Sequence, residues 1–207
     1  MVAIIDYGMG NLASVAKACQ FIGSPARVTF DPAQVRRAQA VIFPGVGAFG
    51  EAMSELKRRR LIGPIVDSIQ SGKPFLGLCL GLQLLFGSSE ESPGVKGLGI
   101  LPGRVRRLPR RKGLKVPHMG WNEIEKISPR NPLLSGIPEG AFMYFVHSYV
   151  AQPEDRSVVS AETEYGGRFP SVLWDGGHLW ATQFHPEKSQ RWGLKLLKNF
   201  LATEAAC

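Results

Sequence analysis

The sequence predicts an α/β fold with a mainly parallel central sheet flanked by helices, and three observations lead to this prediction. Short apolar runs alternate with helix-like segments up to Gly87, which is the pattern of strand–helix–strand units. The apolar runs are continuous rather than alternating, as expected for strands that helices cover on both faces. A chain of 207 residues with 44% hydrophobic content can also bury a core of ordinary size.

The part of the chain before Gly87 contains the strands predicted to be parallel. They are "MVAIIDYG", which Gly8 ends, and then "ARVTF", "AVIFPG" and "KPFLGLC". A helix is predicted over "NLASVAKACQFIG", with Asn11 as its N-cap and Gly23 as its stop, and a short one over "DPAQVRRA", opened by Asp31 and Pro32. A long helical stretch is predicted within residues 48–71, and "PFLGLCLGLQLLFG" leads from a strand into an amphipathic helix.

Shorter β-like pieces follow Gly87, so the second half is predicted to add β-hairpin elements. These pieces are "GILPGRVRRL", "VPHMGWNEIEKI", "AFMYFVHSYVA", "SVVSAETEYGG" and "PSVLWDGGHLWATQFHP". Within the last of them, "WDGGHLW" has the Asp-Gly-Gly signal of a hairpin turn between apolar flanks, and "QRWGLKLLKNFLATEAA" then returns to helical spacing. Because no linker, repeat or low-complexity tract interrupts the chain, residues 1–207 are predicted to form one domain.

Composition argues against several classes of protein. The apolar runs are too short and too glycine-rich to cross a bilayer, and the start of the chain lacks a signal-peptide pattern, so a cytoplasmic protein is expected. The scattered cysteines Cys19, Cys79 and Cys207 form no disulfide framework, and the histidines show no metal-ligand spacing. Much of the formal charge of +8 lies in "RVRRLPRRKGLK", residues 104–115, where no aromatic residues are interleaved. A solvated or partner-facing basic loop is therefore expected rather than a nucleic-acid surface, and its role is not assigned.

Cys79 is the strongest candidate for a catalytic residue. It lies at a predicted strand-to-helix junction, with Gly77 and Gly81 two residues to either side. This is the spacing of a nucleophile elbow, a strained turn whose neighbours lack side chains so that the helix packs close to the sheet. A thiol in such a turn lies at a helix N-terminus, where the thiolate is favoured. The alternative is a small buried hydrophobe, since free cysteine is often buried.

A nucleophilic cysteine needs a histidine base and a third group that orients the imidazole. The best candidates lie in "TQFHPEKS", where His185 closes a strand and Glu187 follows two residues later. Pro186 between them predicts a turn rather than a regular strand. Taken alone, these residues also fit a surface turn with an exposed histidine.

Three motifs together resemble the class I (triad) glutamine amidotransferases. They are "PGVGAFG", "GLCLGLQLL" and "FHPEKS", and they occur in that family's order over essentially the whole chain. The resemblance implies a flavodoxin-like α/β fold in which Cys79 attacks the side-chain amide of L-glutamine, His185 transfers the proton and Glu187 orients His185. No cofactor or metal is expected.

The same resemblance implies a set of binding residues. Backbone N–H groups would stabilise the oxyanion that forms during attack, and they belong to Gly45, Val46 and Leu80. The residues implied to hold the substrate glutamine are Gly47, Gln83, His147, Ser148 and Tyr149.

Weaker segments resemble, more narrowly, the glutaminase subunits of imidazole glycerol phosphate synthases. These segments are "DYGMGNL", "PHMGWN" and "YFVHSY". The resemblance implies a heterodimer with a (β/α)8-barrel cyclase subunit, which uses the ammonia to make imidazole glycerol phosphate and aminoimidazole carboxamide ribonucleotide in histidine biosynthesis. A chain of 207 residues has no room for a synthase domain of its own, which agrees with a separate partner. The residues expected to face this partner are Asn11, Met119, Trp121 and Lys188.

Other interpretations stay open at this stage. A glutaminase subunit could serve another synthase, of anthranilate, aminodeoxychorismate or pyridoxal phosphate, although "PHMGWN" and "YFVHSY" argue against these. A cysteine peptidase or a DJ-1-like protein would share the elbow, but it would require neither Gln83 nor the His185–Glu187 pair. A basic nucleic-acid-binding module would show steeply salt-dependent binding to nucleic acid.

Overall fold

The protein is described by a computed structural model, which covers residues 1–111, 113–128 and 130–204. Lys112 of the basic segment, the end of the predicted C-terminal helix and Cys207 lie outside the described residues.

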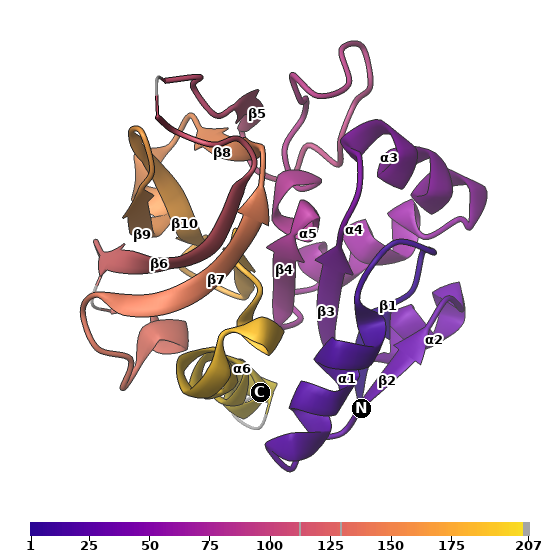
Figure 1. The fold of residues 1–207 in the computed structure, drawn as a ribbon. Helices are drawn as coiled ribbons and strands as arrows, with labels where there is room; N and C mark the ends of the chain where they lie inside the picture. The colour runs from indigo at the N-terminus through magenta and orange to yellow at the C-terminus, as the bar shows by residue number, and fades with distance from the viewer. Residues whose placement is uncertain (112, 129, 205–207) are drawn as a thin grey trace.

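The described residues form a nine-stranded sheet in the order β2-β1-β3-β4-β11-β10-β9-β6-β7. Neighbouring strands are parallel through β2 (Ala26–Thr29), β1 (Val2–Ile5), β3 (Ala40–Gly45), β4 (Phe75–Cys79) and β11 (Leu179–Thr182). They are antiparallel through β10 (Arg168–Trp174), β9 (Val159–Glu164), β6 (His118–Lys126) and β7 (Ala141–His147). Figure 1 shows the antiparallel group on one side of the molecule and β1 to β3 on the other. The predicted α/β class with added hairpins is confirmed.

Helices pack on both faces of the parallel strands. α1 (Leu12–Phe21) and α6 (Gln190–Glu204) cover the face to which Val2 and Ile4 point. α2 (Pro32–Arg37), α3 (Phe49–Arg58) and α4 (Ile62–Gln70) cover the opposite face, to which Ala3 and Ile5 point. Because successive side chains of a strand point to opposite faces, burial on both sides requires the continuous apolar runs seen in the sequence. Within the described residues, no helix combines the length and the apolar character that crossing a membrane requires.

The predicted strand "AFMYFVHSYVA" is two strands in two sheets. β7 ends at His147, and β8 (Tyr149–Pro153) pairs antiparallel with β5 (Gly103–Arg107) in a separate two-stranded sheet. The chain changes sheets at Ser148, whose carbonyl accepts a hydrogen bond from the N–H of Leu108 (2.9 Å) just after β5. Short 3-10 turns complete the described elements, and they are η1 (Pro132–Leu134), η2 (Arg156–Val158) and η3 (Pro186–Lys188).

The helical stretch predicted within residues 48–71 is divided into α3 and α4. Arg60 adopts a left-handed conformation with φ of 57°, and the N–H groups of Arg60 and Leu61 donate to the carbonyls of Lys57 and Leu56. These two bonds form a Schellman motif, which usually has glycine at the left-handed position. Leu61 packs in the same core as Leu56. This contact, rather than a glycine, ends α3, so the sequence carried no visible stop signal.

The amphipathic helix predicted after Cys79 is wrong in length and in character. α5 (Leu80–Gln83) is a single turn, and all of its residues are buried. The apolar residues continue through Leu84, Leu85 and Phe86, which are fully buried. Because no polar face is available for solvent, the chain after this turn packs into the core instead of forming a surface helix.

Of the four predicted cap and turn signals, three have the expected geometry and one does not. Gly23 follows the C-cap of α1 with φ of 81°, as expected for a helix stop. The carboxylate of Asp31 accepts from the N–H of Ala33 (2.8 Å) at the start of α2. Asp175 accepts from the N–H groups of Gly177 (2.8 Å) and Leu179 (3.0 Å) in the turn between β10 and β11. Asn11 occupies the N-cap position of α1, but its side chain makes no capping hydrogen bond.

Candidate active site

Cys79 occupies the strained turn that the sequence predicts. It lies between β4 and α5 with φ of 53° and ψ of −105°, a conformation that side-chain-bearing residues rarely adopt. A Cβ atom on Gly81 would lie 1.9 Å from the carbonyl oxygen of Phe43, and one on Gly77 would lie 3.0 Å from the carbonyl oxygen of Gly81. Gly81 is therefore required for α5 to pack against the sheet, and a side chain at Gly77 would make a tight contact with the same turn. The thiol is held at the carboxyl end of β4.

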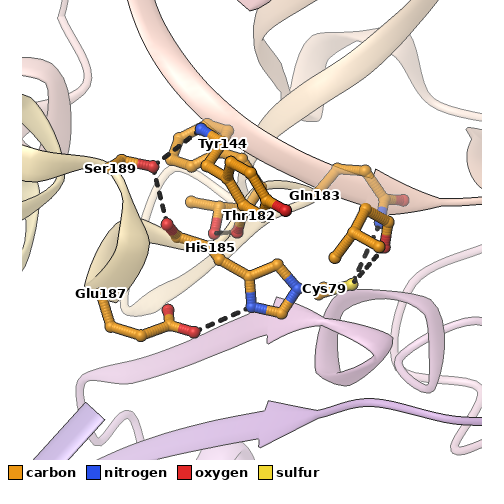
Figure 2. A network of polar contacts seen from close by, with 9 residues as sticks. Cys79, Tyr144, Thr182, Gln183, His185, Glu187 and Ser189 are labelled. Atoms are coloured by element: carbon orange, nitrogen blue, oxygen red, sulfur yellow. Dashed lines mark hydrogen bonds and ion pairs between the residues drawn. The ribbon is translucent and has the colours of Figure 1, made fainter. Parts of the chain in front are cut away.

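His185 and Glu187 lie beside this thiol. His185 precedes η3, which brings Oε1 of Glu187 to 2.9 Å from Nδ1 of His185. The two side chains are buried, with 4% and 1% of their surface exposed. Figure 2 shows the opposite edge of the His185 ring, with Nε2, pointing toward the sulfur of Cys79. The structure thus brings the three predicted catalytic side chains together, in the order nucleophile, imidazole, carboxylate.

The charges around His185 favour its protonated form. Burial lowers the pKa of the imidazole, but the nearby sulfur of Cys79, the hydrogen bond to Glu187 and the charge of Glu187 outweigh this effect and raise the pKa to about 10. At neutral pH His185 is therefore protonated, with Sγ of Cys79 on one side of the ring and the carboxyl group of Glu187 on the other. An imidazolium beside a thiolate holds the proton that a departing amine requires.

Gln183 is a site residue that the sequence analysis did not identify. Its side chain is fully buried, and its Nε2 donates to Sγ of Cys79 at 3.8 Å. The Oε1 atom of Gln183 accepts from Nε2 of Gln83 (3.3 Å). The signal available in the sequence is a glutamine in the otherwise mainly apolar strand-like segment that precedes His185. Gln183 links the nucleophile to Gln83, one turn further along the chain.

The segment at the end of β3 lies alongside the nucleophile. Gly45 is paired with Cys79 in the register of the parallel strands, and a Cβ on Gly45 would lie 2.2 Å from the Tyr7 hydroxyl. Val46 is 39% exposed, and Gly47 has φ of 96°. Among the described residues, no group accepts a hydrogen bond from the N–H of Val46 or of Gly47. These N–H groups are available to a ligand.

A cavity of about 300 Å³ opens beside Cys79. Most of the predicted oxyanion and substrate residues line it, and these are Val46, Gly47, Leu80, Gln83, His147, Ser148 and Tyr149. Gly45 is not part of the lining and lies behind it, against Tyr7 and Leu80. The lining also includes Glu91, Pro117 and Val146, which the sequence analysis did not identify.

Glu91 is the only acidic residue among those that line the cavity in the described part of the chain. Its Oε2 accepts from the N–H of Phe49 (2.8 Å) at the start of α3. The pattern "SSEESPG" gives no reason to choose Glu91 over its neighbour Glu90. In the structure, Oε2 of Glu90 accepts from the N–H of Arg107 (2.8 Å) instead. Only the folded chain therefore distinguishes the two glutamates.

Three of the four predicted interface residues lie on β6, which pairs with β7, or in η3, the turn that holds Glu187. Met119 and Trp121 are exposed on β6, at 63% and 45%. The Trp121 ring packs edge-on against Tyr144 (5.9 Å between centroids), and the ammonium group of Lys188 lies 5.8 Å from the centre of the Tyr144 ring. Asn11, the fourth, occupies the N-cap position of α1, a helix that contacts η3. An aromatic surface with one basic group therefore adjoins the turn that holds Glu187.

Two arginines of the basic segment make contacts with β8. Arg104 and Arg107 lie on β5, where Arg104 donates to Gln152 (3.0 Å) and the Arg107 guanidinium lies 6.0 Å from the centre of the Tyr149 ring. Among the described residues, no group of three or more His, Cys, Asp or Glu side chains is placed to hold a metal ion.

Comparison with known proteins gives a consistent result. The model of the family "Glutamine amidotransferase class-I" matches residues 3–203. The chain is 52% identical over 205 residues to the "Imidazole glycerol phosphate synthase subunit HisH" of Syntrophotalea carbinolica, covering 97% of this chain and 98% of that protein. It is 53% identical over 199 residues to the protein of the same name from Moorella thermoacetica, covering 96% and 93%.

The fold is also shared with solved structures. One described as "Crystal structure of glutamine amidotransferase" superposes with a TM-score of 0.76 at 19% identity, covering 99% of this chain and all of the other. Since the family model spans nearly the whole chain and relatives of about half-identical sequence match over its full length, the protein belongs to the class-I glutamine amidotransferases.

Proposed function

We propose that the protein is the glutaminase subunit of an imidazole glycerol phosphate synthase. The observation that carries the proposal is the assembled Cys79–His185–Glu187 arrangement at the edge of a cavity, in a chain about half identical to proteins named HisH subunits of that enzyme. L-Glutamine is the substrate, and glutamate and ammonia are the products. No cofactor takes part in the proposed reaction.

The chemistry follows from the positions of the three side chains. Sγ of Cys79 attacks the side-chain amide carbon of glutamine, and the carbonyl oxygen becomes an oxyanion. His185 gives its proton to the departing nitrogen, which leaves as ammonia, and a thioester remains on Cys79. His185 then removes a proton from water, which attacks the thioester and releases glutamate. Glu187 holds the imidazole in place and stabilises its charged form throughout.

We assign stabilisation of the oxyanion to backbone N–H groups around the nucleophile. Leu80 follows Cys79 directly. Gly45, which the sequence analysis also named, pairs with Cys79 in the sheet register but lies behind the cavity wall, so the donors proposed from this segment are its next two residues. Val46 and Gly47 continue the same segment along the cavity wall. Once such donors are in place, they stabilise developing charge without further reorganisation, which makes them a large part of catalysis.

We propose that the rest of the cavity recognises the amino-acid end of glutamine. Residues 147–149 and Gln83 form one wall. Glu91 provides a negative charge for the α-ammonium group, and Gly47 lies on the other side. A wall of this composition suits a small zwitterion with an amide side chain.

The proposed partner is a (β/α)8-barrel cyclase subunit, bound at the surface that includes Asn11, Met119, Trp121 and Lys188. Ammonia then passes to the cyclase.

The test is reconstitution of the purified chain with the cyclase subunit and its nucleotide substrate. The expected result is glutamine-dependent formation of imidazole glycerol phosphate, and the absence of a complex or of ammonia release would reject the proposal.

The members of the triad should contribute unequally. We expect His185→Ala to reduce glutaminase kcat/KM nearly as much as loss of Cys79, because the proton carrier is removed. The reduction in kcat/KM for Glu187→Ala should be about a hundredfold smaller, since the imidazole that acts as the base is still present without the group that orients it. Steady-state rates of the complex with the cyclase measure both effects. Small and equal losses for the two variants would indicate that another base serves Cys79.

Glu91→Gln should raise the KM for glutamine about tenfold or more with little change in kcat, because a charge-assisted contact to the substrate ammonium becomes a neutral one. The side-chain amide oxygen of the Glu91→Gln variant can still accept from the N–H of Phe49, so the start of α3 is preserved. Glu90→Gln is the matched control and should leave the KM unchanged. An unchanged KM for Glu91→Gln would place the ammonium elsewhere.

A further inference from the structure

Two buried histidines outside the triad face each other between β6 and β7. His118 and His147 are directly paired in the antiparallel register, and they are 3% and 6% exposed. Nδ1 of His118 lies 3.0 Å from Nε2 of His147. The reaction sequence above uses neither imidazole. A pair of polar rings in a site that apolar side chains would fill equally well needs a physical explanation.

The partners at one end of this pair fix where the ring protons lie. Nδ1 of His147 is 3.0 Å from the carbonyl oxygen of Tyr149, and a carbonyl oxygen only accepts. Nδ1 of His147 therefore carries the proton, and Nε2 of the neutral ring accepts. It follows that His118 donates from its own Nδ1 and accepts at its Nε2.

The other end of the pair agrees with this assignment. Nδ2 of Asn122 lies 3.3 Å from Nε2 of His118. The orientation of this amide is set by its remaining contacts, since Oδ1 accepts from the N–H of Glu123 (2.8 Å) and Nδ2 also donates to the carbonyl of Glu164 (3.0 Å). Every donor in the chain Asn122–His118–His147–Tyr149 thus points the same way. We call these four residues the histidine relay.

The surroundings keep both rings neutral. His118 is stacked between Tyr165 and Phe145, at 3.9 and 4.9 Å between centroids, and His147 packs against Phe169 at 5.1 Å. Burial lowers the pKa of His118 to about 4. Burial, with the charge of a protonated His118 as a further cause, lowers the pKa of His147 to about 3. At neutral pH each ring has one donor and one acceptor, as the relay requires.

The relay ends on the wall of the substrate cavity. The carbonyl of Tyr149 accepts from His147 and also from Nε2 of Gln83 (3.0 Å). Gln83 in turn contacts Gln183, which donates to Sγ of Cys79 (3.8 Å). The segment 147–149 is therefore held from the core by the relay and from the elbow by Gln83, so its position relative to the sulfur depends on both.

We propose that His118 and His147 are positioning residues for glutamine: the relay holds segment 147–149 at the distance from Cys79 at which the segment binds the substrate. The inference rests on the proposed glutaminase function, because it assigns these residues a role in binding that substrate. They act through the Tyr149 carbonyl rather than by touching the reacting atoms. An apolar pair could fill the same volume, but it could not provide a directed hydrogen bond to that carbonyl.

Asparagine and glutamine variants test the direction of the relay, because asparagine places an amide nitrogen near Nδ1 of the replaced ring and glutamine places one near Nε2. His147→Asn keeps the donor to Tyr149, and His147→Gln loses it. Likewise, His118→Asn keeps the donor to His147, and His118→Gln loses it. In the complex with the cyclase, we expect each glutamine variant to raise the KM for glutamine about tenfold. His118→Asn should stay within about threefold of wild type. His147→Asn changes a residue of the cavity wall itself, so the expectation there is that it raises the KM clearly less than His147→Gln does.

A purely structural role predicts a different result. Both substitutions at one position remove the same aromatic stacking, so they would lower thermal stability alike and leave no difference in KM between asparagine and glutamine. Equal KM values for the two variants at each position overturn the proposal. His178→Asn and His178→Gln are the matched controls, since His178 is exposed in the turn between β10 and β11, and both should match wild type.

The protonation of the two rings can also be measured directly in the unmodified chain, which tests the relay even if a variant fails to fold. Nitrogen NMR of isotope-labelled histidine should show His118 and His147 protonated at Nδ1 and unprotonated at Nε2. A proton on Nε2 of either ring overturns the relay. This readout does not depend on activity. Failure of the relay is thus separable from failure of the proposed function, which an absence of ammonia release in the wild-type complex would reveal.

Discussion

Replacing Cys79 with alanine is expected to reduce glutamine hydrolysis by about 10⁴-fold or more, because Sγ is the atom that forms the thioester and no other group can replace it. The fold should be retained. Sγ makes two weak hydrogen bonds, to Val146 and from Gln183, each at 3.8 Å, and the Cβ that keeps the turn strained is still present. Ammonia release by the complex and thermal unfolding of the variant measure the two expectations.

Two further measurements identify the nucleophile. Added ammonia should restore product formation by the complex of Cys79→Ala with the cyclase, because it bypasses glutamine hydrolysis. Cys19→Ala should be fully active, since Cys19 lies on the buried face of α1 and burial raises the pKa of its thiol to about 11. Ammonia release by Cys79→Ala, or labelling of Cys19 or Cys207 by an electrophilic glutamine analogue, would contradict the assignment.

The isolated chain is expected to hydrolyse glutamine about a hundred- to a thousandfold more slowly than its complex with the cyclase and nucleotide, because one oxyanion donor is missing until the partner binds. The triad is unsuited to such switching, since Cys79 is fixed by the elbow and His185 is paired with Glu187 in a buried turn. The segment 44–47 is better suited. Glycines flank Val46, and the N–H groups of Val46 and Gly47 have no acceptor among the described residues.

Substitutions at Val46 test this idea directly. Val46→Pro removes the N–H, so the complex should stay near the low rate of the isolated chain. Val46→Ala keeps the N–H and should be activated normally. Binding of the cyclase is measured for both variants, to separate loss of the donor from loss of the complex. Full activity in the isolated wild-type chain, or normal activation of Val46→Pro, would show that the rate is not limited by this donor.

Local patterns were sufficient to predict the parallel strands and the elbow. Continuous apolar runs identify β1, β3 and β4 because strands buried on both faces have no solvent side. Gly77 and Gly81 identify the turn at Cys79. A side chain at Gly77 would meet the backbone of Gly81, and a side chain at Gly81 would meet the backbone of Phe43 in the adjacent strand. The pairing of His185 with Glu187 was predictable as well, since both lie in one short turn.

The breaks in regular structure were not predictable from local patterns. The end of α3 has Arg60 where glycine is usual, and the packing of Leu61 against the core stabilises that turn. The single turn of α5 is likewise decided by burial on all sides. In both places tertiary contacts outweigh the intrinsic preference for helix, which amounts to only about 0.7 kcal/mol per residue or less for ordinary residues.

The sequence by itself determined the fold class and was enough to predict Cys79 as the nucleophile and His185 as its base, because each depends on neighbours along the chain or on a repeated pattern. Only the tertiary structure decided that Glu91 lines the cavity while Glu90 does not, that Gln183 contacts Cys79, and that His118 meets His147. These contacts join residues on strands and loops that are distant in sequence, and they depend on register and on side-chain direction. A shift of one residue in the pairing of β6 with β7 would turn His118 to the opposite face and break the relay.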